Sequence, residues 1–275
     1  MIRFDHASKT YPGGTRAVED FSLTVEQGST TVFLGTSGCG KTTLMRMVNA
    51  MVTPTSGTVF VRGQDVAGED PVRLRRSIGY VLQEGGLFPH RSIADNIATV
   101  PRLEGATKQT SHERALELLE LVGLDLEMAD RYPAQLSGGQ RQRVGVARAL
   151  ANRADILLMD EPFGALDPIV RAELQCELKE IQRALGTTIL FVTHDVDEAF
   201  TLGDQVAVLS TGGRIEQVGT PAELLSSPAS PFVAEFVGAS RAARPVRVAG
   251  PDGLVVDDAG TPVGTLTTDE AGDRP

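Results

Sequence analysis

The apolar positions in the first quarter of the chain predict strands around one helix. Residues 21–26 alternate apolar and polar side chains, which is typical of a strand with one buried face. Residues 31–34 form a short apolar run that ends at Gly35, as a fully buried parallel strand would. Residues 41–51 carry apolar side chains at helical spacing, and residues 58–63 predict another strand.

Helical spacing dominates between residues 93 and 150, and strands then alternate with helices. Within the helical stretch, Thr110 and Glu113 fit a capping box, and Gly123 is placed where that helix would end. The later pattern predicts strands over 156–159, 188–192 and 205–209 and helices over 170–185 and 196–202. Such alternation implies a parallel sheet covered on both faces, with a helical subdomain of about residues 88–150 inserted into it.

The composition changes near residue 241, where Ala, Gly, Pro and Asp become frequent. We therefore expect one domain over residues 1–240 and a short tail over residues 241–275. Residues 254–266 could form a β-hairpin that turns near Ala259 and Gly260. A disordered tail is the alternative, because an isolated hairpin is only marginally stable in water.

The composition is that of an ordinary soluble globular protein, with 41% hydrophobic and 23% charged residues. A net charge of −10 argues against a protein that binds the phosphate backbone of nucleic acids. No apolar run approaches the roughly 20 residues of a membrane-spanning helix, and the first residues do not form a secretory signal. Cys39 and Cys176 indicate reduced thiols, so we expect a cytoplasmic protein.

A glycine-rich motif follows the apolar run at residues 31–34. Gly35, Gly40, Lys41 and Thr42 have the spacing of a phosphate-binding loop (P-loop), between a predicted strand and a predicted helix. Glycines let successive backbone N–H groups point at phosphate oxygens, and the helix N-terminus adds partial positive charge. We expect Lys41 to reach the β- and γ-phosphates of ATP and Thr42 to ligate Mg²⁺. The alternative is a glycine-rich turn with a capping threonine.

Two carboxylates, Asp160 and Glu161, follow the apolar run at residues 156–159. In open α/β sheets, ligands bind beyond the carboxyl ends of the strands, which is where these side chains are predicted to lie. Asp160 would hold Mg²⁺, and Glu161 would polarise an attacking water as a general base. The alternative is an ordinary acidic turn at the end of a strand.

A third motif, Leu136-Ser-Gly-Gly-Gln140, precedes a predicted helix. Ser137 and Gln140 fit a capping box, which would be a purely structural role. A capped helix N-terminus preceded by glycines is also an anion-binding end. The chain would then have two phosphate-binding ends, and a single ATP cannot easily use both within one fold.

With these three motifs, the chain resembles the nucleotide-binding subunits of ABC transporters over about residues 2–238. The resemblance implies an α/β fold: a P-loop NTPase core of parallel sheet flanked by helices, an N-terminal antiparallel β subdomain and an inserted α-helical subdomain. In that family two subunits associate head to tail, so residues 136–140 of one close on ATP held by the other. The resemblance therefore implies an ATP-dependent homodimer whose nucleotide site comprises Gly35, Thr36, Ser37, Gly38, Cys39, Gly40, Lys41, Thr42, Thr43, Ser137, Gly138, Gly139 and Gln140.

Four further residues match family motifs. Tyr11 matches the aromatic residue that stacks on adenine, and a core or turn tyrosine is the alternative. Gln83 matches the Q-loop glutamine that contacts Mg²⁺ and the water. Asp167 matches the D-loop aspartate that contacts the partner's site, and His194 matches the switch histidine that senses the γ-phosphate. The resemblance thus implies Glu161, His194 and Gln83 as catalytic residues, and Thr42, Gln83 and Asp160 as the Mg²⁺ site.

Within the family, residues 35–43, 70–76 and 86–90 most resemble the importers of osmoprotectants such as glycine betaine, carnitine and choline. This resemblance implies integral-membrane permease subunits as partners, a solute-binding protein acting through the permease, and a place on the inner face of the cell membrane. An importer of another solute, such as an amino acid or amine, is one alternative, and a soluble ABC ATPase not coupled to transport is another. Relatives often end in paired regulatory domains, which the tail is too short to form, so we expect that regulation to be absent.

Overall fold

Parallel strands form the centre of the first unit of the chain, Met1–Pro221. The computed structural model describes residues 1–83, 85–238, 247–249, 254–256 and 262–265. The strand order is β10-β9-β3-β8-β7-β6, and all neighbours are parallel except β10, which pairs antiparallel at one edge. These strands are β3 (Thr30–Gly35), β6 (Gly79–Val81), β7 (Ile156–Asp160), β8 (Thr188–Thr193), β9 (Gln205–Ser210) and β10 (Arg214–Gly219).

Every residue of β3 and β8 is buried, which explains why both strands have apolar runs without alternation. The register aligns the carboxyl ends of the central strands. Leu34 on β3 lies opposite Thr193 on β8, and Asp160 at the end of β7 lies opposite Val192. The residues that follow β3, β7 and β8 therefore emerge at one edge of the sheet.

An antiparallel sheet of order β2-β1-β4-β5 packs against the parallel sheet through three phenylalanines. Phe4 and Phe21 come from the antiparallel sheet and Phe33 from β3, and their ring centroids lie 5.1 to 6.0 Å apart, close to edge-to-face geometry for two of the three pairs. All three are buried. The strands are β1 (Ile2–Thr10), β2 (Arg16–Val25), β4 (Ser56–Val61) and β5 (Gln64–Asp65).

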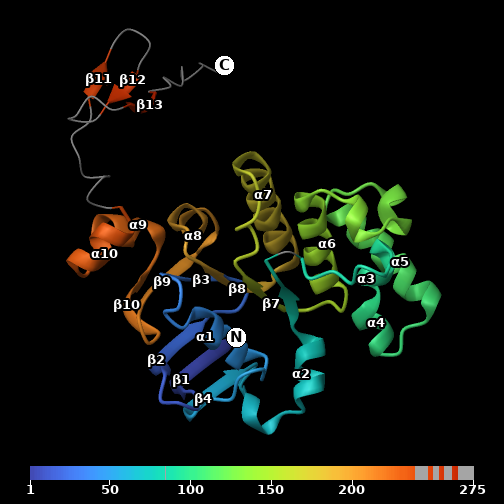
Figure 1. Cartoon of the computed structure of the whole chain (residues 1–275), viewed down its shortest axis with the longest axis horizontal. Helices are drawn as coiled ribbons and strands as arrows, with labels where there is room; N and C mark the ends of the chain where they lie inside the picture. The colour runs from blue at the N-terminus through green and yellow to red at the C-terminus, as the bar shows by residue number, and fades with distance from the viewer. Residues whose placement is uncertain (84, 239–246, 250–253, 257–261, 266–275) are drawn as a thin grey trace, which may run out of the picture. The chain divides into compact units, whose positions relative to one another are not determined.

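Helix α1 contacts both sheets, because it touches β2 and β4 as well as β3 and β8. Figure 1 shows α1 on the same side of the parallel sheet as β1, β2 and β4, with α7 and α8 on the other side. The predicted α/β core with a separate antiparallel subdomain is confirmed. Outside the insertion, the described helices that lie wholly within the first unit are α1 (Lys41–Val48), η1 (Val66–Gly68), α2 (Pro71–Ser77), α7 (Pro168–Leu185) and α8 (Val196–Leu202).

The middle of the chain is helical, as the periodicity predicts, and its helices pack on one another through α3–α6, α5–α6 and α3–α5 contacts. The predicted capping box at Thr110 and Glu113 is wrong. Thr107 is the N-cap, since its hydroxyl accepts a hydrogen bond from the Thr110 N–H at 3.1 Å. The elements are α3 (Ile93–Ile97), α4 (Thr99–Leu103), α5 (Lys108–Leu121), η2 (Leu126–Asp130), η3 (Pro133–Gln135) and α6 (Gly138–Leu150).

The helix predicted over residues 41–51 is also too long, because α1 ends at Val48. Beyond it, the N–H groups of Met51 and Val52 both bond to the Arg46 carbonyl, and Ala50 adopts a left-handed conformation with φ of 54°. No helix among the described residues is both long enough and apolar enough to cross a bilayer.

The second unit, Ala222–Pro275, contains short helices and a small antiparallel sheet of order β11-β12-β13. The strands on either side of the expected hairpin turn, β12 and β13, are paired, and β11 adds a third strand. The turn near Ala259 and Gly260 lies outside the described residues. The elements are α9 (Pro221–Ser226), which begins in the first unit, α10 (Pro231–Phe236), β11 (Arg247–Ala249), β12 (Leu254–Val256) and β13 (Pro262–Thr265).

An ion pair joins the end of β4 in the antiparallel sheet to the start of β7 in the parallel sheet. Arg62, directly after β4, donates from Nε to Oδ2 of Asp155 at 3.0 Å, and Asp155 directly precedes β7. The same guanidinium donates to the hydroxyl and the carbonyl of Ser77 at 3.1 and 3.2 Å. The hydrogen bond from Arg62 holds the pKa of the Asp155 carboxyl below its usual value of 3.8.

Replacing Arg62 by Met should lower the free energy of unfolding at pH 7 by about 1 kcal/mol, because the pair is partly exposed. Since the pKa of Asp155 is lower in the folded state, the contribution of the pair is complete above pH 3.8 and declines as the pH falls below it. Urea denaturation of both proteins at several pH values measures this difference. A difference that persists unchanged at pH 2 would contradict the assignment.

Candidate active site

The P-loop connects β3 to α1, as the sequence predicts, and its geometry depends on glycine. Gly40 has φ of 114°, and a Cβ atom there would lie 2.4 Å from the carbonyl oxygen of Ala17. The loop is also tied to the β9–β10 turn, because the Gly213 N–H donates to the Cys39 carbonyl at 2.6 Å. Positions 36–38 form the exposed tip of the loop, which leaves backbone N–H groups accessible to an anion.

Lys41 is 4% exposed, and its ammonium group turns back onto the loop. Its Nζ donates to the carbonyl oxygens of Gly35 at 2.6 Å and Thr36 at 3.0 Å. The thiol of Cys39, which is also buried, lies 3.9 Å from the same Nζ. Two carbonyl oxygens therefore hold the lysine charge at the base of the loop.

Thr42 and Asp160 come together although 118 positions separate them. The Thr42 hydroxyl donates to Oδ1 of Asp160 at 3.0 Å, and the Tyr80 hydroxyl donates to Oδ2 at 3.4 Å. Burial raises the pKa of Tyr80, and the Asp160 carboxylate raises it further, so the phenol stays protonated as a donor. Hydroxyl and carboxylate oxygens are the ligands that Mg²⁺ prefers.

These oxygens fit Mg²⁺ only if a phosphate or water supplies the remaining ligands. In the described part of the chain, no group of three or more His, Cys, Asp or Glu side chains could hold a metal by itself. Mg²⁺ is commonly bound through one or two protein groups together with substrate phosphates. Thr42 and Asp160 therefore suit a metal that arrives with its nucleotide.

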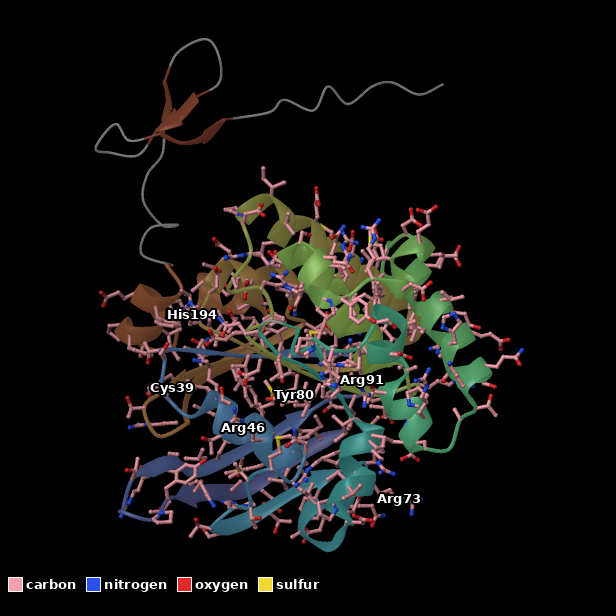
Figure 2. All side chains as sticks on the ribbon, turned by 45° about the vertical axis from the view of Figure 1, so that its right-hand side comes forward. Cys39, Arg46, Arg73, Tyr80, Arg91 and His194 are labelled. Carbon is pink, nitrogen blue, oxygen red and sulfur yellow. The ribbon has the colours of Figure 1, made fainter. Side chains whose placement is uncertain are left out.

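A hollow of about 600 Å³ lies beside Thr42 and Asp160. The predicted residues Gln83 and Glu161 reach it together with Thr42 and Asp160, so the fold brings four of the expected side chains to one space. Its lining residues are Thr42, Arg46, Leu82, Gln83, Gly86, Asp160 and Glu161. Figure 2 labels Arg46, which is on α1, and Tyr80, which is on β6, and the two labels lie close together in that view.

Glu161 and His194 are also neighbours. Nδ1 of His194 lies 3.2 Å from Oε2 of Glu161. Glu161 adopts a left-handed conformation with φ of 46°, which is uncommon for a residue other than glycine. Its N–H donates to the Val192 carbonyl at 2.9 Å, so the backbone of β8 fixes the turn that carries this carboxylate. The pair therefore stands at the carboxyl ends of β7 and β8.

The backbone after Gln83 is held against α6 by Arg148. The Arg148 guanidinium donates to the carbonyl oxygens of Gly85 and Gly86, both at 2.7 Å. Burial lowers the pKa of this guanidinium. Gln142, on the same helix, donates to the Leu82 carbonyl at 3.4 Å. Side chains of α6 thus bind backbone carbonyls on both sides of Gln83.

Ser137 and Gln140 form a reciprocal capping box at the start of α6, which confirms the structural role predicted for them. The Ser137 hydroxyl accepts from the Gln140 N–H at 3.2 Å, and the Gln140 side chain accepts from the Ser137 N–H at 2.9 Å. Ser137 remains exposed. No hydrogen bond or ion pair links residues 136–140 to residues 35–43 where the structure describes them.

Two other predicted residues lie apart from the hollow. Tyr11 directly follows β1, is 37% exposed, and has the Lys9 ammonium 5.4 Å from its ring centroid. Asp167 caps α7, since its Oδ1 accepts from the Val170 N–H at 3.1 Å. Nothing in the described contacts joins either side chain to the P-loop, so the roles implied by the resemblance stay predictions for both.

Sequence reasoning missed Arg46, Tyr80 and Arg148. Tyr80 lies on β6, the short strand that leads to Gln83, where alternation of buried and half-buried residues is the signal that could have indicated it. Arg46 is the exposed residue within the buried apolar run Leu44–Val48 of α1, and its charge at that position is a signal in the sequence. Arg148 contacts a segment 62 to 63 positions away, and no local signal reveals it.

Comparison with known proteins shows which family has a sequence similar to the one that carries these residues. Residues 18–164 match the family described as ABC transporter. The chain is 52% identical over 241 residues to the carnitine transport ATP-binding protein OpuCA of Listeria monocytogenes, covering 88% of this chain and 60% of that protein. It thus spans less than two thirds of the length of that relative.

Two further similarities cover most of the compared protein. The chain is 48% identical over 240 residues to the glycine betaine uptake system ATP-binding protein YehX of Escherichia coli, covering 87% of this chain and 77% of that protein. Its fold is similar to that of the ATP-binding cassette MJ0796, whose structure was solved as a dimer in a post-hydrolysis state bound to ADP and Pi. That similarity has a TM-score of 0.72 and 31% identity, and it covers 80% of this chain and 99% of the other.

Proposed function

This chain belongs to the ABC transporter family, and from that membership we propose that it is an ATP-hydrolysing subunit that energises solute import. The observation that carries the proposal is the convergence of Thr42, Gln83, Asp160 and Glu161 on one hollow at the end of the P-loop. A nucleotide whose phosphates lie in the loop would present its γ-phosphate to this space.

The P-loop would bind the phosphates through its backbone N–H groups and Lys41. On binding, the Lys41 ammonium would exchange its bonds with the Gly35 and Thr36 carbonyls for phosphate oxygens. Thr42 and Asp160 would hold Mg²⁺, which neutralises charge on the phosphates when bound. The Tyr80 hydroxyl would keep the Asp160 carboxylate oriented toward Thr42.

Glu161 would act as the general base and His194 would orient it. The carboxylate stands in the hollow and accepts a proton from the attacking water, while Nδ1 of His194 restricts its rotation. Gln83, which also lines the hollow, would contact the same water. Because Arg148 fixes the turn after Gln83, a shift of α6 would move this glutamine with it.

Replacing Glu161 by Gln should lower kcat for ATP hydrolysis by about 10²-fold or more, because the amide cannot accept the proton. Binding of a fluorescent ATP analogue should stay within a few fold of wild type, since the amide preserves the size of the side chain. Steady-state phosphate release and equilibrium titration provide the two measurements. Hydrolysis near the wild-type rate would show that another group is the base.

We also propose that the Ser137–Gln140 end of α6 completes the site of a second subunit. This end is capped, its Ser137 is exposed, and it lacks a described contact with the P-loop of its own chain. A helix N-terminus of this kind favours an anion. ATP would therefore hold together a head-to-tail homodimer with two composite sites.

Mixing two inactive variants tests this arrangement. Lys41→Ala removes the P-loop lysine and Ser137→Arg blocks the capped end, so each variant alone should be inactive. An equal mixture should recover roughly a quarter of wild-type activity, because half of the randomly formed dimers are mixed and each has one of two sites intact. ATPase assays of each variant and of the mixture decide the matter. A mixture as inactive as its components would exclude sites shared between subunits.

For the transported solute we propose a quaternary-amine osmoprotectant, in keeping with the relatives named for carnitine and glycine betaine transport. The chain would act on the inner face of the cell membrane with integral-membrane permease subunits, and indirectly with a solute-binding protein. No residue of this chain is assigned to the solute, so another amine or an amino acid is the second candidate. A soluble ATPase that is not coupled to transport is the third.

Proteoliposomes that contain this chain, its co-purified permease subunits and the solute-binding protein can distinguish these candidates. We expect glycine betaine, choline or carnitine to raise ATP hydrolysis several fold, because solute binding favours the conformation that also favours ATP. The Glu161→Gln variant serves as the background control. Stimulation by amino acids or polyamines alone would replace the proposed solute, and failure to recover any membrane partner would favour a soluble ATPase.

A further inference from the structure

Arg171, in the first turn of α7, bridges two loops beside the Glu161–His194 pair. Its Nη2 donates to the Leu166 carbonyl at 3.3 Å, in the segment that follows Glu161 along the chain. Its Nη1 donates to Oδ2 of Asp195 at 3.0 Å, in the segment that follows β8. The guanidinium is thus a direct connection between the two segments that carry the pair.

The backbone on both sides of His194 is anchored by the partners of this connection. The Thr193 hydroxyl accepts from the Asp195 N–H at 3.0 Å and donates to Oε2 of Glu198 at 2.6 Å. Oδ1 of Asp195 accepts from the N–H groups of Asp197 and Glu198 at 2.9 and 3.2 Å. Asp195 therefore uses one oxygen to cap α8 and the other to bind Arg171.

The charges of this cluster explain why an arginine stands there. Glu198 is 3% exposed, and burial raises the pKa of its carboxyl, although the bond from Thr193 opposes this shift. Nε of Arg171 is buried, lacks a hydrogen-bond partner among the described residues, and lies 3.8 Å from Oε1 of Glu198. A lysine has one ammonium group and cannot reach Leu166, Asp195 and Glu198 with the planar geometry of a guanidinium.

We propose that Arg171 is a positioning residue for catalysis, which holds His194 at the distance where its Nδ1 orients the Glu161 carboxylate. The role rests on the proposed ATPase function. Without Arg171, the Leu166 carbonyl and the Asp195 carboxylate lose their shared donor. The bond from the Glu161 N–H to the Val192 carbonyl remains, but the backbone that follows His194 is freed and the histidine can move relative to the carboxylate. A displacement of about 1 Å of a catalytic group can reduce a rate by about 10²-fold.

The kinetic test uses the whole chain and compares the R171M and H194A variants with the variant that carries both substitutions. Arg171→Met should lower kcat at least tenfold with KM for ATP changed less than threefold. The double variant R171M/H194A should be no slower than H194A, because Arg171 acts through His194. Arg62→Met serves as the control, since Arg62 has a similar exposure (31% against 27%) and also bonds an aspartate, but that aspartate precedes the amino end of β7, whereas Glu161 follows its carboxyl end. Its kcat should stay within twofold of wild type.

A second measurement follows His194 without ATPase activity. The chain has four histidines, so the ring resonances of His194 can be assigned by their loss in H194A. In R171M the His194 ring resonances should shift or broaden, whereas R62M should leave them unchanged. If R171M does not fold, R171K provides the same comparison, because it keeps the charge and loses the fork.

The outcomes separate this inference from the proposed function. A wild-type protein without ATPase activity but with His194 resonances that respond to R171M would refute the ATPase and keep the positioning contact. An active wild type whose R171M variant retains normal kcat would overturn the inference. So would a double variant slowed relative to H194A by the same factor as R171M relative to wild type. Unchanged His194 resonances in R171M would also refute it.

Discussion

The parallel pairing of β3, β7 and β8 is the constraint on which the candidate site depends. Their register aligns Leu34 with Thr193 and Asp160 with Val192, so chain segments far apart in sequence leave the sheet at one edge. Because both strand faces are buried, a shift of register would also displace apolar side chains from their contacts. The chemistry at the edge and the packing of the core thus require the same alignment.

Arginine side chains join the pieces that the sheet does not hold together. Arg62 connects the antiparallel sheet to the start of β7, Arg148 connects α6 to the turn after Gln83, and Arg171 connects α7 to the segment around His194. Each guanidinium donates to at least one backbone carbonyl. A planar group with five donors can bind two segments at once in a fixed geometry, which the compact ammonium group of a lysine does not provide. These contacts allow pieces of the chain to move as connected bodies.

The sequence predicts the parts of this protein whose signal is local. Apolar runs identify the buried strands, and the spacing of Gly35, Gly40 and Lys41 identifies the loop between β3 and α1. The predicted cap at Thr110 is wrong because Thr107 and Thr110 both suit a helix cap in sequence, and only the fold selects between them. The arginine contacts could not be predicted, since Arg148 bonds to residues more than 60 positions away and Arg171 to a residue 24 positions away.

The left-handed backbone of Glu161 has a consequence for how this position can vary. A conformation of this kind costs a residue other than glycine about 1 kcal/mol or more, and it persists only where the surroundings enforce it. Glycine or asparagine would suit the turn better but would lack the carboxylate. Stability and chemistry therefore favour different amino acids at position 161, and selection for stability alone would remove the glutamate.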